Sequence, residues 1–423
     1  MTKDSPGGGA RAPRILLLNW RDTGHPEGGG SEVYAENVAE GLSERGYDVT
    51  ILTARYPGSP RTTMLPRGTR IVRAGGRLSV YSRSAMAVLR HEVPRPDLII
   101  EVQNGVPYFA AAWGRGIRHV VLVHHVHREQ WPVVFGPVVA RLGWLAESRV
   151  APWVNRHRPY VAVSEITRRE LAELGVDSDR VTVIHNGTIR PPAHDVQRTE
   201  HPQVLVLGRL VPHKRVEIAV DAVARLRQEF PGLRLVVAGR GWWQPQLEQY
   251  VRERGLEDAV ELRGFVSEEE RHRLLASSWV SLVPSIKEGW GLVVVEAGLH
   301  ETPSIAFRGS GGVEESIVDG ETGFLARHDD TEDFTGLTRS LLADAERRER
   351  MGRAAHAFAS HFTWDASVER FAALIDAQLG RPHMPASETG APLGIDHEEP
   401  ISLGESPRVP EHGHRLQQVQ RRL

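Results

Sequence analysis

The chain has 423 residues, more than one domain usually holds, and its 40% hydrophobic and 25% charged residues are typical of a globular protein with two cores. Its formal net charge of −2 does not favour nucleic-acid binding, and the absence of cysteine excludes disulfides, thiolate metal sites and thiol nucleophiles. We therefore expect two domains, no nucleic-acid partner and a cytoplasmic location.

A strand, a glycine-rich loop and a helix open the first predicted domain. Residues 14–20 form an apolar strand, and the loop after it contains Gly29 and Gly30. A helical pattern starts at Glu32, with Ser31 as its expected N-cap. Because glycine lets a ligand approach the backbone, this order of elements suits a phosphate-bearing ligand. The spacing differs from the G-x-G-x-x-G dinucleotide fingerprint, so we predict no nicotinamide site.

Strands and helices alternate through the rest of this domain, residues 14–190. That alternation predicts a parallel sheet with helices on both faces, whose functional residues lie at the carboxyl ends of strands. His124 and His125 fall at one such end. The expected strands are residues 48–53, 97–103, 118–124, 160–164 and 180–185, and the expected helices include residues 82–91 and 165–174.

Residues 136–154 come nearest to a membrane-spanning run, but Arg141, Glu147 and Arg149 interrupt them. A spanning helix needs about 20 apolar residues, so we predict none. Two interpretations stay open: a helix packed on its own domain, or a helix lying along a membrane surface. In the second, the apolar side would consist of Trp144, Leu145, Val150 and Trp153. That interpretation predicts peripheral contact at the inner face of a membrane.

The alternation restarts in a second domain, residues 202–363. Its expected strands are residues 204–207, 233–238, 259–263, 279–283 and 304–307, and its expected helices are residues 215–230, 244–254, 267–276, 291–300 and 332–352. A last helix spans residues 364–380. Both domains are therefore predicted to be doubly wound α/β folds.

Three segments outside these domains are predicted to be irregular. Residues 1–13 are polar and glycine-rich, without the apolar centre of a signal peptide, and we expect them to be flexible. Residues 191–201 are rich in proline, histidine and mixed polar residues, which indicates a linker. Residues 381–423 lack hydrophobic periodicity, which indicates a disordered tail.

The second domain opens with the sequence VLVLGRLVPHKR, which places Arg209 in a loop and Lys214 at the expected start of a helix. Two cations beside a helix N-terminus can clamp a diphosphate, with arginine as a bidentate donor and lysine as a point charge. The simpler alternative is two solvated surface cations. Their place at the carboxyl end of a strand favours the clamp.

Two carboxylates flank another turn in the stretch WVSLVPSIKEGWGLVVVEAGLHETP, residues 279–303. Glu288 precedes the turn and Glu296 lies in the helix after it, with seven residues between them. A glutamate beside two glycines and a helix N-terminus offers a charged acceptor and free N–H donors together. The arrangement suits a ligand with hydroxyls and an anionic group, although an ordinary strand–loop–helix unit would show the same pattern.

These motifs together resemble the family 4 retaining glycosyltransferases of the GT-B fold. GGGSEVYAENVAEGLSERGYDVTILT, GRLVPHKR, the Glu288–Glu296 pair and GGVEESIVDGETGFL occur in the order typical of that family, across residues 14–380. The resemblance implies two doubly wound Rossmann-like domains that face each other across a cleft. It also implies that a nucleotide sugar binds mainly to the second domain and that the helix at residues 364–380 crosses back to the first.

The resemblance assigns the charged site residues position by position. Arg209 and Lys214 would hold the donor diphosphate, Glu288 would face the hydroxyls of the transferred sugar, and Glu296 would bind the ribose. His124 would match a histidine near the sugar's C6 hydroxyl and anomeric region. His125 is its alternative, because the HHVH run leaves that match ambiguous by one residue.

The resemblance also assigns three loops. Gly264, Phe265 and Val266 would lie against the nucleobase, and Gly29 and Gly30 would lie near the phosphates and the acceptor. The backbone N–H groups of a third loop would assist in binding the sugar, and this loop consists of Gly289, Trp290, Gly291 and Leu292.

The implied reaction is metal-independent transfer of a hexosyl group from UDP- or GDP-hexose to a hydroxyl acceptor, which could be a saccharide, a lipid or a small molecule. It would retain the anomeric configuration by front-face attack and need no cofactor beyond the nucleotide-sugar co-substrate. Fixed cations would stabilise the leaving diphosphate. No metal-ligand cluster is evident, and no acidic partner is evident for His127.

Three alternatives stay open. Glu288 could act as a covalent nucleophile in a two-carboxylate mechanism. The chain could instead be a GT-B-type sugar-nucleotide epimerase, or a non-catalytic sugar-nucleotide-binding protein.

Overall fold

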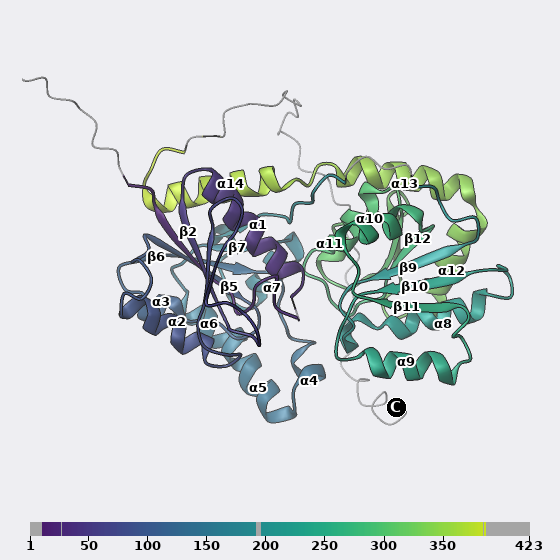
Figure 1. Cartoon of the computed structure of the whole chain (residues 1–423), viewed down its shortest axis with the longest axis horizontal. Helices are drawn as coiled ribbons and strands as arrows, with labels where there is room; N and C mark the ends of the chain where they lie inside the picture. The colour runs from purple at the N-terminus through teal and green to yellow at the C-terminus, as the bar shows by residue number, and fades with distance from the viewer. Residues whose placement is uncertain (1–10, 27, 192–195, 384, 386–423) are drawn as a thin grey trace, which may run out of the picture. The chain divides into compact units, whose positions relative to one another are not determined.

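Two β-sheets flanked by helices organise the chain, one in each half of the sequence (Figure 1). The structure is a computed structural model, and it describes residues 11–26, 28–191, 196–383 and 385. Most of the expected N-terminal segment, part of the expected linker and almost all of the expected tail therefore lie outside the described residues.

The first sheet has eight strands in the order β3-β4-β2-β1-β5-β6-β7-β8, parallel except for β3 against β4. The strands are β1 (Arg14–Leu18), β2 (Asp48–Thr53), β3 (Thr62–Met64), β4 (Arg70–Arg73), β5 (Leu98–Gln103), β6 (Arg118–Val123), β7 (Tyr160–Ala162) and β8 (Val181–Val183). The helices are α1 (Gly30–Glu44), α2 (Val80–Leu89), α3 (Ala110–Trp113), α4 (Trp131–Val134), α5 (Pro137–Leu145), the π-helical turn η1 (Ala146–Val150), α6 (Ala151–Val154), α7 (Glu165–Glu173) and the 3₁₀ turn η2 (Ser178–Arg180).

The apolar run of β1 is buried on both faces of this sheet. Ile15 and Leu17 join a core that includes α1, and Leu16 and Leu18 join the core on the opposite face, which includes α2. Side chains alternate between the faces of a strand, so a continuous apolar run is what a strand covered on both sides requires.

The second sheet has six parallel strands in the order β11-β10-β9-β12-β13-β14. The strands are β9 (Gln203–Leu207), β10 (Arg234–Ala238), β11 (Val260–Gly264), β12 (Val280–Val283), β13 (Ser304–Phe307) and β14 (Gly323–Ala326). The helical elements are η3 (Pro212–Lys214), α8 (Val216–Leu226), α9 (Gln244–Glu253), α10 (Glu268–Ser277), α11 (Leu292–Leu299), η4 (Gly312–Glu314), α12 (Thr331–Ala343), α13 (Ala345–Ala359) and α14 (Trp364–Leu379).

The last helix, α14, packs against α1 of the first sheet's domain. Val368 fits against Gly41, where an added Cβ would lie 2.5 Å from a Val368 methyl carbon. Tyr47 donates a hydrogen bond to Asp376 at 2.7 Å, and Phe371 is fully buried in the shared core. Glycine at position 41 therefore allows the two helices to approach closely.

Several elements differ from the sequence prediction. Strands β3, β4 and β14, of three or four residues each, were not predicted. The predicted helix at residues 332–352 is two helices, which meet at Asp344, the N-cap of α13. Ser31 is not the N-cap of α1: Gly29 holds that position, and Glu32 accepts the Gly29 N–H at 2.6 Å. A membrane-spanning helix is absent from the described part of the chain.

The α1–α14 contact predicts opposite effects for two glycine-to-alanine changes in helices. Gly41→Ala should lower the free energy of unfolding by about 1–3 kcal/mol, because the new methyl group overlaps Val368. Gly336→Ala in α12 should raise it by about 0.5–1 kcal/mol, because no atom lies within 4 Å of an added Cβ and alanine favours helix. Denaturant unfolding of both variants measures this, and equal effects would contradict the close approach at Gly41.

Candidate functional site

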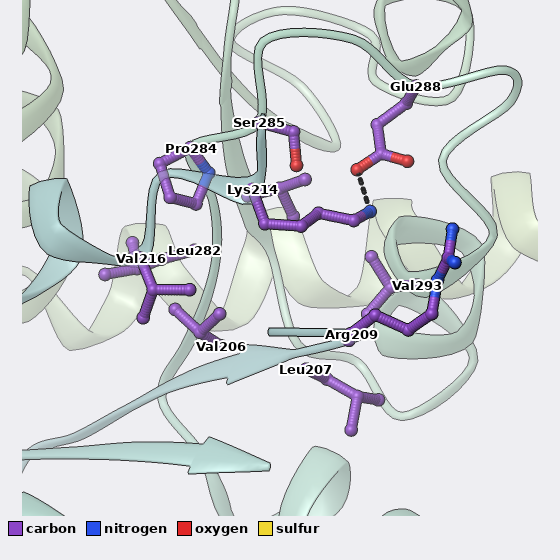
Figure 2. A pocket seen from close by; sticks show the side chains of 12 residues that line it. Val206, Leu207, Arg209, Lys214, Val216, Leu282, Pro284, Ser285, Glu288 and Val293 are labelled. Carbon is purple, nitrogen blue, oxygen red and sulfur yellow. Dashed lines mark hydrogen bonds and ion pairs between the residues drawn. The ribbon is translucent and has the colours of Figure 1, made fainter. Parts of the chain in front are cut away.

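An ion pair between Lys214 and Glu288 lies at the carboxyl end of the second sheet (Figure 2). The two side chains are only 19% and 15% exposed. Lys214 does not start a helix, as the sequence predicted. It ends the 3₁₀ turn η3, and Arg215, with φ of 48°, separates it from α8. The pocket around the pair is lined by Leu207, Gly208, Arg209, Val283, Ser285 and Val293, among others.

The backbone on both sides fixes the position of Glu288. The Glu288 N–H donates to the carbonyl of Ser310 at 2.8 Å, and its own carbonyl accepts the N–H of Gly312 at 2.9 Å. These bonds form an isolated bridge between Glu288 and Gly311. The main chain at Glu288 is therefore held by the loop after β13 as well as by its own loop.

The charge on Glu288 is set by two opposing effects. Burial alone would raise its pKa, but the Lys214 ammonium and a hydrogen bond from Ser285 outweigh burial and hold the pKa of Glu288 below its ordinary value. Glu288 is therefore ionised at neutral pH. The Lys214 ammonium can change partners if a ligand supplies more negative charge than the Glu288 carboxylate.

Arg209 reaches the same site from the end of β9. In Figure 2 its side chain extends from the strand towards the space beside Lys214 and Glu288. It also lies against the start of α1, since a Cβ at Gly29 would be 3.0 Å from the Arg209 Nε atom. A Cβ at Gly30 would meet no atom within 4 Å. The structure thus brings Arg209, Lys214, Glu288 and the predicted glycine loop together.

The loop after Glu288 needs glycine at two positions. A Cβ at Gly289 would lie 2.5 Å from the carbonyl oxygen of His124. Gly291 has φ of 83° and would place a Cβ 2.8 Å from Ser316 Oγ. Val293, in the first turn of α11, lines the pocket around the ion pair.

The ring of Trp290, in contrast, belongs to the hydrophobic core. It is 3% exposed and packs on His185 and Phe362, with ring centroids 4.3 and 4.9 Å apart. Only the backbone of Trp290 can therefore serve the role predicted for it.

Glu296 opens onto a second pocket, on the other side of α11. It pairs with Arg271 at 3.1 Å, and the pocket is also lined by Leu292, His300 and Thr188. Burial raises the pKa of Glu296, and Arg271 opposes that rise only in part. The two predicted glutamates thus have different partners and different charge environments, which the sequence alone did not reveal.

His124 and His125 occupy different surroundings. His124 is buried edge-on against Tyr34, with centroids 5.2 Å apart, and burial, then His127, lowers its pKa to about 3. Its Nε2 atom has no partner within the described residues. His125 shares a hydrogen bond of 3.0 Å with Gln130, and burial also lowers its pKa. Both rings are therefore neutral at pH 7, and His124 is the one whose backbone contacts Gly289.

The sequence prediction missed a buried carboxylate beside these histidines. Glu147 is fully buried and accepts hydrogen bonds from His127 Nδ1 at 2.9 Å and Trp131 Nε1 at 2.6 Å. The expectation that His127 lacks an acidic partner was therefore wrong. The two residues are twenty positions apart, and Glu147 is turned inward on the π-helical turn η1, a geometry that spacing does not reveal. No group of three or more potential metal ligands occurs within the described residues.

The predicted nucleobase loop combines an exposed ring with a buried neighbour. Phe265 is 67% exposed, and the Arg240 guanidinium lies 4.9 Å from its ring centroid. Gly264 has φ of 67°, and its carbonyl accepts the N–H of Gly239 at 2.7 Å. Val266 packs on the core of the second sheet. An aromatic face with a cation beside it can stack on a planar ring.

Two family models match the chain, one in each half. "Glycosyltransferase Family 4" matches residues 28–189, and "Glycosyl transferases group 1" matches residues 193–358. Together they account for more than three quarters of the sequence.

Known proteins of this kind resemble the chain along most of its length. The D-inositol 3-phosphate glycosyltransferase of Nocardia farcinica is 32% identical over 241 residues, covering 53% of each chain. The glycogen synthase of Mycobacterium tuberculosis is 26% identical over 417 residues, covering 90% of this chain and 99% of the relative.

Solved structures share the fold. Sucrose-phosphate synthase from Thermosynechococcus elongatus matches with a TM-score of 0.74 at 20% identity, covering 87% of this chain and 99% of that one. The Anabaena protein Alr3699/HepE, in complex with UDP and glucose, matches with a TM-score of 0.66 at 19% identity, covering 86% and 100%.

These matches agree with the two doubly wound domains and with the motifs that the structure gathers at the carboxyl end of the second sheet. The chain belongs to the family 4 glycosyltransferases of the GT-B fold, and it is a glycosyltransferase.

Proposed function

We propose that the enzyme transfers a hexosyl group from UDP- or GDP-hexose to a hydroxyl acceptor, with retention of configuration and without a metal ion. The observation that carries this proposal is the Lys214–Glu288 ion pair beside Arg209 at the carboxyl end of the second sheet. The Anabaena structures that share the fold contain UDP, UDP-glucose or UDP with glucose, which supports a nucleotide-sugar donor.

The donor diphosphate would bind between the two cations. A charge-assisted hydrogen bond contributes about 1.5–3 kcal/mol, and Arg209 and Lys214 can each offer at least one. Phosphate oxygens would replace Glu288 as the partner of Lys214. The released carboxylate of Glu288 could then accept hydrogen bonds from the sugar hydroxyls. In this scheme the same ammonium stabilises the leaving diphosphate, so no metal is required.

Retention is proposed to follow from front-face attack. The acceptor oxygen approaches the anomeric carbon on the side from which the diphosphate leaves, and a departing phosphate oxygen takes the acceptor proton. A covalent role for Glu288 is less favoured, because its carboxylate is paired with Lys214 and its main chain is fixed by the bridge to Gly311.

The remaining assignments are proposals of the same kind. Glu296 would bind the ribose, and residues 264–266 would lie along the nucleobase, with Phe265 and Arg240 as the stacking surface. His124 or His125 would contact the sugar as a neutral ring. Gly29 and Gly30 would leave room for the phosphates and the acceptor, since Gly30 faces open space.

We also propose a cytoplasmic enzyme that contacts the inner face of a membrane as a peripheral protein. Its acceptor could be a saccharide, a lipid or a small molecule. An epimerase acting on the same donor, and a non-catalytic sugar-nucleotide sensor, are the competing functions.

Radiolabelled donors distinguish these functions. Incubation with UDP- and GDP-hexoses and candidate acceptors should release nucleotide only when an acceptor is present, and EDTA should leave that rate unchanged. A changed sugar on an intact nucleotide would establish epimerisation, and binding without conversion would establish a sensor. Loss of turnover in EDTA that is restored by a divalent cation would contradict metal independence.

The cation clamp predicts large kinetic effects. Arg209→Ala and Lys214→Ala should each lower turnover by about one to two orders of magnitude, on the scale of a lost charged hydrogen bond. Arg353→Ala, at an exposed position on α13, is the matched control and should leave turnover unchanged. Normal turnover in both Arg209→Ala and Lys214→Ala would remove the clamp from the mechanism.

Because His213 is held neutral in the folded protein, we expect the free energy of unfolding to decrease in weak acid. Burial, then Lys214 and Arg209, lowers the pKa of His213 to about 4, while the unfolded chain titrates near 6.5. As the pH drops, the unfolded state therefore binds the extra proton before the folded state does. The free energy of unfolding decreases by about 1.4 kcal/mol per pH unit for this histidine, between about pH 6.5 and pH 4.

His213→Gln should reduce that pH dependence. Denaturant unfolding at pH 7.5 and 5.5 gives the comparison, with His361→Gln, an exposed histidine, as the control. An identical pH dependence in wild type and His213→Gln would show that His213 is not held neutral.

A further inference from the structure

Large hydrophobic side chains are exposed in a cluster on the first domain. Eight of the sixteen exposed large hydrophobic residues in the described chain fall within residues 133–153. They are Val133, Phe135, Val138, Val139, Leu142, Leu145, Val150 and Trp153. We call this set the α4–α6 apolar surface, since α4, α5, η1 and α6 carry it. In proteins whose other large hydrophobic side chains are mostly buried, exposed apolar patches of this kind mark interaction sites.

The packing of α5 explains why this surface faces outward. The helix turns Ala140 inward and is closely packed at Gly143, where an added Cβ would lie 2.3 Å from the Trp131 ring. Trp131 is anchored in turn by its hydrogen bond to the buried Glu147. Val138, Leu142 and Leu145 follow the i, i+4, i+7 spacing of a single helix face and are 69%, 62% and 52% exposed. In Figure 1, α4 and α5 lie at the margin of the first domain.

Cations surround the apolar side chains. The exposed arginines of residues 128–158 are Arg128, Arg141, Arg149 and Arg156, with Arg158 half-buried. The same stretch contains two acids, of which Glu147 is fully buried and only Glu129 is exposed. Arg156 lies 5.4 Å from the Trp153 ring, and Arg128 lies 5.2 Å from the Trp144 ring. Arginine next to tryptophan and aliphatic side chains is a composition that suits the interface of a bilayer.

We propose that the α4–α6 apolar surface docks on a bilayer that contains anionic phospholipid. The side chains of α5 and Trp153 would enter the headgroup boundary, and the arginines would contact lipid phosphates. Self-association through this surface is disfavoured, because a two-fold dimer would place arginines against arginines. Within residues 128–158 the exposed acid is Glu129, and the nearby Glu173 already pairs with Arg128. The proposal deepens the suggested peripheral location by naming the surface and the lipid chemistry, and it does not depend on the donor or acceptor.

Vesicle flotation with the full chain tests the docking. Wild type should bind vesicles of phosphatidylcholine with one third phosphatidylglycerol and bind pure phosphatidylcholine much more weakly. A variant combining Val138→Ser, Leu142→Ser and Leu145→Ser should lose at least about tenfold in partition coefficient. The matched control combines Met64→Ser, Leu78→Ser and Leu89→Ser, which are exposed apolar positions elsewhere in the same domain, and it should bind like wild type.

A second variant examines the charges. Arg141, Arg149 and Arg156 are replaced with Gln in this variant. Each replacement should lower the partition coefficient on anionic vesicles by about fivefold, so that the preference for anionic over neutral vesicles is lost. Nucleotide-sugar binding in solution, measured on every variant, shows whether the fold is retained and is expected to be unchanged. Binding failure in wild type, or equal binding by the apolar and control triples, would overturn the proposal. Sedimentation that shows a dimer abolished by the apolar triple would also overturn it, in favour of a second copy as the partner.

Discussion

The buried ion pair between Lys214 and Glu288 is the interaction on which the candidate site depends. Neither charge could be held at such low exposure alone, since removing one partner of a buried pair leaves the other uncompensated. Lys214 thus keeps Glu288 ionised, and Glu288 keeps an ammonium at a position where a diphosphate could take over. In the proposed mechanism, an ion pair of Lys214 with the donor diphosphate would replace its ion pair with Glu288 when the donor binds.

Close backbone packing gives this pair its position. Glycine at 289 allows a contact with the His124 carbonyl that a side chain would prevent, and glycines at 29 and 291 leave close space for Arg209 and Ser316. The bridge from Glu288 to Gly311 ties the main chain at Glu288 to the loop after β13. Close packing therefore fixes residues from both halves of the sequence near one another.

Much of the fold followed from the sequence, because buried parallel strands are continuous apolar runs and the helices between them have clear starts and stops. Strands β3 and β4 were not predicted, because they are short and only partly buried and therefore lack a continuous apolar run. Strand β14 was not predicted either. The sequence also predicted that Arg209 and Glu288 lie in loops after strands and that Glu296 lies inside the next helix, whereas its placement of Lys214 at a helix start was wrong. The sequence did not reveal which of these side chains form ion pairs, because the partners are distant in sequence. The pairs are Lys214 with Glu288, Glu296 with Arg271 and His127 with Glu147. The sequence left two interpretations of residues 136–154 open, a helix packed on its own domain or a helix lying along a membrane surface. The structure buries Ala140 and exposes Val138, Leu142 and Leu145, which the sequence alone did not assign to opposite sides of a helix.

The central claim is that a ligand's phosphate oxygens replace the Glu288 carboxylate as the partner of Lys214. Calorimetric measurement of UDP and GDP affinity in two variants tests it most directly. Glu288→Gln removes the internal competitor for the ammonium, so it should bind the preferred nucleoside diphosphate at least as tightly as wild type. Lys214→Met should bind it at least about tenfold more weakly, on the scale of one charged hydrogen bond. Equal weakening in both variants would contradict the account, because it would show that the pair supports the fold and does not yield its lysine to the ligand.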